Sequence, residues 1–150
     1  MEKFLLLSNL ASLDRHIDGN TVPEVEPAPK IEINLGETAM RFLSIYKTVE
    51  RNVPPSQDEM DRMGKLIEEG TKAGWLLGTE GCLPTALGAR VRRANGKINV
   101  TDGPFTEAKE VVGGFAILKA NSREEAIELT RTFLQNAGDG ECELRQLYEQ

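Results

Sequence analysis

Two helix-start signals constrain the fold of this chain more than any other sequence feature. Each is a capping box, in which a serine hydroxyl and a glutamate three residues later bond to the free N–H groups of a helix start. The pairs are Ser56 with Glu59 and Ser122 with Glu125. Apolar side chains at helical spacing follow each pair: Met60, Met63 and Ile67 after the first, and Ala126, Ile127, Thr130, Phe133, Leu134 and Ala137 after the second. We therefore predict two helices, the first ended by Gly70 or Gly74 and the second by Gly138 and Gly140.

Strand patterns lie on both sides of each predicted helix. The predicted strands are residues 41–47, 75–83, 111–119 and 142–148, and residues 89–101 form a hairpin. The Asn95-Gly96 pair in that hairpin supplies positive φ at little cost. The order strand, helix, strand, hairpin, strand, helix, strand favours an α+β fold. In such a fold, the two helices lie on one face of a mostly antiparallel sheet.

A sheet with helices on one side has a second face that its own helices leave uncovered. The candidates for that face are apolar or aromatic: Tyr46, Trp75 or Leu76, and Phe115 or Ile117. Exposure of such a face to water is unfavourable, and packing against a second copy would cover it. We therefore expect a homodimer, or a higher oligomer, that forms through this face.

Residues 1–39 differ in composition from the rest of the chain. They hold seven acidic and three basic residues, with Pro23, Pro27 and Pro29 close together. Because proline disrupts helices and central strands, this stretch is predicted to be an extended linker. We divide the chain into an N-terminal extension, residues 1–39, and a domain, residues 40–150.

Composition and charge exclude several classes of protein. A net charge of −6 argues against nucleic-acid binding, which needs a basic surface. No apolar run reaches transmembrane length. Glu2 places a negative charge in the region that is positively charged in a signal peptide, so we do not expect one. Cys82 and Cys142 lie far apart, and His16 is remote from both, so we predict two buried thiols and no metal or cofactor. We expect a cytoplasmic protein without a nucleic-acid or membrane partner.

The densest group of unusual residues lies at 101–110, with the sequence TDGPFTEAKE. Asp102-Gly103-Pro104 is strong turn chemistry, and one interpretation is that Asp102 only braces this turn. The alternative is that Asp102 projects into a cleft together with Glu80 and Lys109. A neighbouring carboxylate and burial raise the pKa of an acid and a lysine lowers it, so Asp102 would be placed for acid–base work.

These residues also resemble the signature of the DGPF family, within the YCII-related group. Residues 101–110 are followed by Gly113-Gly114-Phe115, as in that signature. Residues 80–84 (EGCLP) are similar to the family's Glu-Gly-Leu strand end, and residues 40–43 (MRFL) to its usual N-terminus. The resemblance covers roughly residues 40–148. It implies a ferredoxin-like fold that assembles into a dimeric α/β barrel.

The same resemblance bears on the chemistry. A His–Asp pair has been suggested for YCII-related proteins, and its aspartate corresponds to Asp102. This chain departs from that pattern, because no histidine follows His16. A His–Asp pair within the domain, or a heme held by a histidine there, is therefore not expected. Some family members accompany sigma factors, which implies that a regulatory role is a rival to catalysis.

We interpret the chain first as a small-molecule-binding or regulatory protein. A cleft would hold a small polar metabolite, and its lining residues would be Tyr46, Glu80, Asp102, Phe105 and Lys109. One alternative is a cofactor-free enzyme that catalyses proton transfer or isomerisation with Asp102 as the base. Another is a protein-interaction module that docks through residues 1–39.

Overall fold

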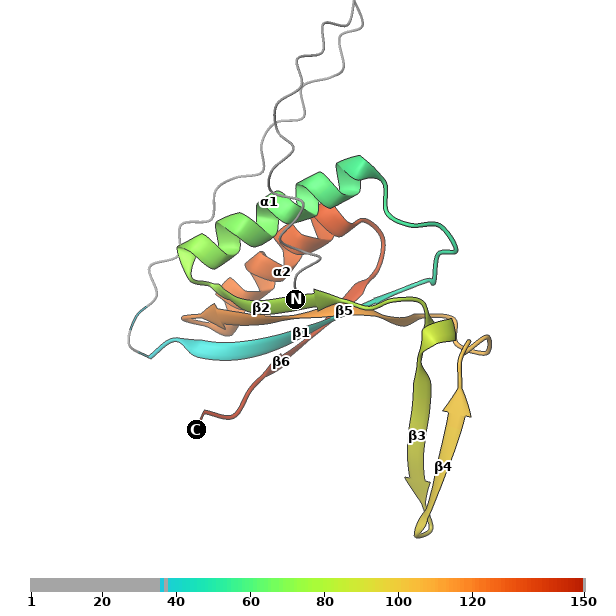
Figure 1. The fold of residues 1–150 in the computed structure, drawn as a ribbon. Coiled ribbons are helices and arrows are strands. Elements are labelled where there is room, and N and C mark those ends of the chain that lie inside the picture. Colours follow the sequence, from blue (N-terminus) through green and yellow to red (C-terminus); the bar gives the residue numbers. More distant parts are fainter. Residues whose placement is uncertain (1–35, 37, 150) are drawn as a thin grey trace, which may run out of the picture.

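Four strands form one sheet in the computed structural model of this chain, which describes residue 36 and residues 38–149. In chain order the elements are β1 (Met40–Thr48), α1 (Gln57–Ala73), β2 (Leu76–Gly81), the short 3₁₀ helix η2 (Thr85–Leu87), β3 (Ala89–Ala94), β4 (Lys97–Asp102), β5 (Val111–Ala120), α2 (Arg123–Ala137) and β6 (Glu141–Gln146). The strand order is β2-β5-β1-β6, and all neighbouring pairs are antiparallel. The fold is α+β, as predicted, and it is compatible with a ferredoxin-like fold (Figure 1).

Both helices begin where the sequence predicted. Ser56 Oγ accepts a hydrogen bond from Glu59 N at 3.3 Å, and Glu59 Oε2 accepts one from Ser56 N at 2.7 Å, which completes the first capping box. At the second helix, Ser122 Oγ accepts from Glu125 N at 3.1 Å. The Glu125 carboxylate differs from the prediction, because it accepts from the backbone N–H of Asn121 instead of Ser122. This helix start therefore has half of a capping box.

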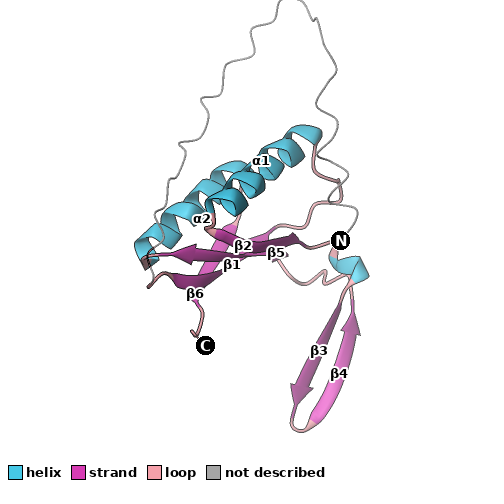
Figure 2. Cartoon of the chain, turned by 60° about the vertical axis from the view of Figure 1, so that its left-hand side comes forward, coloured by secondary structure: helices cyan, strands magenta, loops and turns pink. Residues whose placement is uncertain are grey.

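The core lies between the helices and one face of the sheet (Figure 2). Its buried hydrophobic residues are Phe42, Trp75, Leu76, Leu118, Ala120, Ala126 and Leu129. Leu129, only 1% exposed, is the helix residue that the predicted apolar stripe missed. Met60, predicted to belong to the stripe of the first helix, is instead exposed. At the end of α1, a side chain on Gly70 would begin 2.6 Å from the Trp75 ring, so glycine allows this close packing.

The face of the sheet opposite the helices is lined by alternate residues of β1 and β5. Phe42 points into the core, so Leu43 and Ile45 point away from it, and they pair in register with Ile117 and Phe115. Phe115 is 38% exposed. Strand β5 is therefore not buried on both faces. We call these four residues, Leu43, Ile45, Phe115 and Ile117, the open face.

Three residues that the sequence suggested for this open face lie elsewhere. Tyr46 points to the helix side, where its ring meets Phe133 edge-on at 5.3 Å between centroids. Trp75 and Leu76 are buried in the core. The expectation that Tyr46 and one of Trp75 and Leu76 lie on the open face was therefore wrong. The reason is that Tyr46 has the same strand parity as Phe42, and the helices cover that side.

Strands β3 and β4 form a separate two-stranded sheet inserted between β2 and β5. Asn95 and Gly96 at its tip have φ of 49° and 76°, as the predicted turn requires. Every residue of the two strands is exposed. The hairpin extends away from the sheet on the side opposite the helices, in both views (Figures 1 and 2).

The predicted extension lies almost wholly outside the described residues. This applies to the proline-rich linker and to His16. The first described strand begins at Met40, the residue at which we divided the chain.

Candidate functional site

The loop of residues 103–110, which leaves the hairpin, is fastened to η2 through Thr85. The Glu50 carboxylate accepts hydrogen bonds from Thr85 N at 2.5 Å and from Thr85 Oγ1 at 2.8 Å. The same hydroxyl oxygen accepts a hydrogen bond from Phe105 N at 3.2 Å. A partly buried threonine thus links the segment after β1 to the loop after β4.

Gly103 packs closely against the backbone of η2. Its N–H donates to the carbonyl oxygen of Gly88 at 2.9 Å. A Cβ built on Gly103 would lie 1.7 Å from the carbonyl oxygen of Thr85, a distance that no side chain tolerates. The glycine in the TDGPF sequence is therefore required by packing of the loop against η2.

Arg90 ties the base of the hairpin to the same loop. Its guanidinium carbon lies 3.9 Å from the centroid of the Phe105 ring, a cation–π contact. The guanidinium also forms an ion pair with the Glu107 carboxylate. The pKa of Glu107 is lowered by a hydrogen bond from its own backbone N–H and then by Arg90. Phe105, predicted to contact a ligand, is therefore packed beneath an arginine.

The predicted acid–base residues are all exposed. Asp102 ends β4 and pairs with Ala89, Glu80 pairs with Phe115 on the open face, and Lys109 lies in the loop. The side chains of Asp102, Glu80 and Lys109 make no hydrogen bond or ion pair with any described residue. The Asp102 side chain therefore does not brace the turn through a hydrogen bond. The close packing of Gly103 on Thr85 and the hydrogen bonds between Thr85 and Glu50 hold this region together.

Tyr46 is separated from the other predicted ligand-binding residues. Its hydroxyl donates to the carbonyl oxygen of Asp139 at 2.9 Å, on the helix side of the sheet. Glu80 shares the open face with Phe115. The structure therefore places Tyr46 and Glu80 on opposite faces of the sheet.

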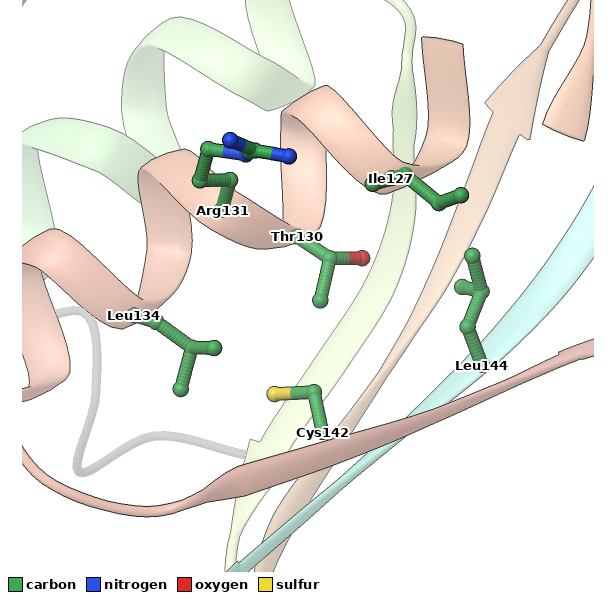
Figure 3. A pocket seen from close by; sticks show the side chains of 6 residues that line it. All are labelled: Ile127, Thr130, Arg131, Leu134, Cys142 and Leu144. Carbon is green, nitrogen blue, oxygen red and sulfur yellow. The ribbon is translucent and has the colours of Figure 1, made fainter. Parts of the chain in front are cut away.

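A cavity that the sequence did not point to lies between α2 and β6 (Figure 3). Its volume is about 230 Å³, and it is lined by Ile127, Thr130, Arg131, Leu134, Cys142 and Leu144. The lining is mostly apolar, because the Thr130 hydroxyl already donates to the carbonyl oxygen of Ala126 at 2.8 Å. Arg131 is paired with Glu128 at 3.5 Å. Cys142 and Leu144 alternate in β6, so they point to the same face of the sheet, but alternation alone does not indicate a cavity.

The sequence pattern of the YCII-related domain matches residues 40–149 of this chain, which span every described helix and strand. The chain belongs to the YCII-related family. One relative, an uncharacterized protein of Rhizobium meliloti (strain 1021), is 36% identical to it over 66 residues. Those residues are 43% of this chain and 53% of the relative, so the match spans about half the length of that protein.

The two thiols of this YCII-related domain differ in their surroundings. Cys142 is partly buried, and burial raises the pKa of its thiol, although a hydrogen bond with Ser44 opposes this shift. Cys82 is exposed at the end of β2. The prediction that both thiols are buried is therefore wrong for Cys82, because residues 82–84 leave the sheet before η2.

No group of three histidine, cysteine, aspartate or glutamate side chains in residues 36 and 38–149 is placed to hold a metal ion. Neither of the described α-helices is long and apolar enough to cross a membrane.

Proposed function

We propose that this YCII-related protein binds a small polar metabolite as a homodimer. The binding site is the region where the open face meets the base of the hairpin. Glu80, Asp102 and Lys109 are its polar contacts. The two carboxylates accept hydrogen bonds and the ammonium group donates them, so this set suits a ligand that carries both kinds of group.

One observation carries this proposal: the polar side chains of this region divide into two groups. The first group is engaged in holding the loop and the hairpin in place: Glu50, Thr85, Arg90 and Glu107. The second group, Glu80, Asp102 and Lys109, has no partner among the described residues. Binding residues often lie on loops that a scaffold holds in position, and this arrangement supports the proposal.

The homodimer is supported by the open face. Leu43, Ile45, Phe115 and Ile117 form an apolar centre that no described element of the chain covers. Charged side chains surround it, including Lys47, which pairs with Glu143 at 2.7 Å. An apolar centre with a charged margin is the composition of a protein interface.

Two finer assignments belong to the same proposal. Residues 101–110 with Gly113-Gly114-Phe115 support placement within the DGPF subgroup of the family. Cys82 and Cys142 are free thiols, as is usual in a reducing compartment, which supports a cytoplasmic location.

Binding is tested by thermal unfolding in the presence of a panel of amino acids, carboxylic acids, sugar phosphates and nucleosides. A ligand of the folded state raises the melting temperature by mass action. The stabilisation should shrink in Glu80→Gln and in Asp102→Asn and persist in Glu68→Gln, which alters an exposed carboxylate of α1. If no compound stabilises the wild type, or if the two site variants respond as the wild type does, the proposal is wrong.

The Asp102→Asn variant also separates binding from catalysis. Because the Asp102 side chain has no hydrogen-bond partner in the described chain, this variant should unfold at the wild-type temperature when no ligand is present. Conversion of a bound compound by the wild type, with none by Asp102→Asn, would identify the protein as an enzyme that uses Asp102 as its base.

A further inference from the structure

The two faces of the β3–β4 hairpin differ in chemistry. Val91 pairs with Val100 in register, and Ile98 lies on the same face two residues away. Val91 is 70% exposed, Val100 63% and Ile98 66%. Arg93 shares this face, in register with Ile98, and Asp102 lies at its base opposite Ala89. The other face carries Arg90, Arg92 and Lys97. The hairpin therefore presents an apolar ladder that is uncovered within the described chain.

An exposed apolar ladder on a two-stranded sheet is unfavourable for an isolated chain. A single hairpin is marginally stable in water without a surface to pack against. This one is fixed at its base, where Arg90 contacts Phe105 and Glu107 and Gly103 packs against Thr85. Its orientation is thus set by the domain, whereas its apolar face has no covering surface on the described part of its own chain.

The hairpin points toward the place where a partner on the open face would lie. Figures 1 and 2 show β3 and β4 extending away from the sheet on the side opposite α1 and α2. That side is the side of Leu43, Ile45, Phe115 and Ile117. A strand of six residues is about 20 Å long, so the hairpin reaches well beyond the sheet surface. A second copy that covered the open face would meet it.

The charge of the hairpin fits a second copy of this chain. Residues 89–102 hold four basic side chains and one acidic one, a net charge of +3, whereas the whole chain carries −6. The remainder of each copy therefore carries −9, and it attracts a basic arm from its partner. A basic hairpin could also bind the phosphates of a nucleic acid. The negative charge of the rest of the chain repels those phosphates, which favours a second copy as the partner.

We propose that the β3–β4 hairpin is an intersubunit arm, which packs Val91, Ile98 and Val100 on a second copy of this chain. This inference rests on the homodimer proposed above and not on the ligand site. It assigns the insertion between β2 and β5 a role in holding the two subunits together.

The test is the dimer dissociation constant, measured by sedimentation equilibrium for the full chain and two variants. Val100→Asp places a charge on the apolar face, and Asn99→Asp places the same charge on the opposite face of the same strand. Since an unpaired charge buried in an interface is costly, Val100→Asp should raise the dissociation constant by about tenfold or more. Asn99→Asp should leave it within about twofold, because rim charges contribute little.

Limited trypsin digestion checks the same arm without a mutation. Arg92 and Arg93 lie in the exposed strand, so cleavage there should slow as the protein concentration passes the dissociation constant. An unchanged rate would overturn the proposal. Protection that appears only when a DNA duplex is added would show that the hairpin binds nucleic acid and would also overturn it.

An open-face variant, Ile117→Asp, distinguishes the homodimer proposal from the proposal that the hairpin is an intersubunit arm. If Ile117→Asp dissociates the dimer while Val100→Asp behaves like Asn99→Asp, the homodimer stands and the arm is wrong. If the wild type is a monomer at tens of micromolar, both are wrong, and the ligand-binding proposal is then judged on the thermal shifts alone.

Discussion

Gly103 packs so closely on Thr85 that a Cβ at position 103 would lie 1.7 Å from the Thr85 carbonyl oxygen. Gly103 belongs to the loop after β4, and Thr85 begins η2. The contact joins the two ends of the inserted hairpin, and the hydrogen bond from Gly103 N to Gly88 O adds to it. Part of the TDGPF sequence therefore has a structural role, which is to fix the direction of the hairpin.

Replacing this glycine should be costly. We expect Gly103→Ala to lower the free energy of unfolding by about 3 kcal/mol, because the backbone of the loop or of η2 must move to admit a methyl group. The measurement is urea denaturation followed by circular dichroism. Gly64→Ala is the matched control. Its Cβ meets nothing within 4 Å, and alanine in a helix interior should stabilise by about 1 kcal/mol. Equal effects of the two changes would contradict this account.

The hydroxyl of Thr85 is the centre of the hydrogen-bond cluster with Glu50 and Phe105. Thr85→Val keeps the shape of the side chain but removes the donor to Glu50 and the acceptor for Phe105 N. We expect a loss of about 1–3 kcal/mol, the cost of leaving partly buried polar groups without partners. Thr101→Val, at an exposed hairpin position, should be close to neutral in the same urea titration. A neutral Thr85→Val would show that the cluster contributes little.

The position of Tyr46 on the helix side of the sheet can be tested by mutation. Tyr46→Phe removes the hydrogen bond to Asp139 O and keeps the ring contact with Phe133. The free energy of unfolding should fall by about 1 kcal/mol. Any ligand found in the thermal-shift panel should stabilise this variant as much as the wild type. A selective loss of ligand response would place Tyr46 in the binding site after all.

The first capping box makes stability depend on pH. The backbone N–H of Ser56 and the Arg51 guanidinium lower the pKa of Glu59 to about 2, from an ordinary value of 4.5. Because the folded-state pKa is the lower one, the stabilisation is complete above pH 4.5 and is lost as the pH falls toward 2. Glu59→Gln should therefore be less stable than the wild type at neutral pH, with a difference that narrows across this range. Urea titrations at several pH values test this, with Glu68→Gln as the control.

The two thiols should react at different rates. Cys82 is exposed, whereas burial raises the pKa of Cys142 and so lowers the fraction of reactive thiolate at neutral pH. With an aromatic disulfide reagent we expect one fast and one slow phase. Cys82→Ser should remove the fast phase and Cys142→Ser the slow one. In urea the two rates should converge, and a slow phase that survives there would contradict burial as its cause.

The sequence predicted those parts of the fold that depend on neighbouring residues. The Ser56–Glu59 box, the Asn95-Gly96 turn and the order of elements were all readable, because caps, turns and periodicity act over a few residues. Alternation in β1 also separated Phe42, Ser44 and Tyr46 from Leu43 and Ile45. What alternation could not say is which of these two sets faces the helices. For that reason Tyr46 was placed on the wrong side.

Only the tertiary structure decided what the loop of residues 103–110 does. Its contacts with Arg90 and Thr85 join residues 17 and 20 positions apart, and Thr85 is held in turn by Glu50, 35 positions away. No local pattern reports such contacts. Tertiary packing also left Asp102, Glu80 and Lys109 without partners in the described chain and directed the hairpin away from the helices. The sequence alone determined the elements and the family signature, because those are set by local chemistry. The fold decided which side chains are engaged in packing and which remain exposed without a partner in the described chain, because that depends on segments brought together from distant parts of the chain.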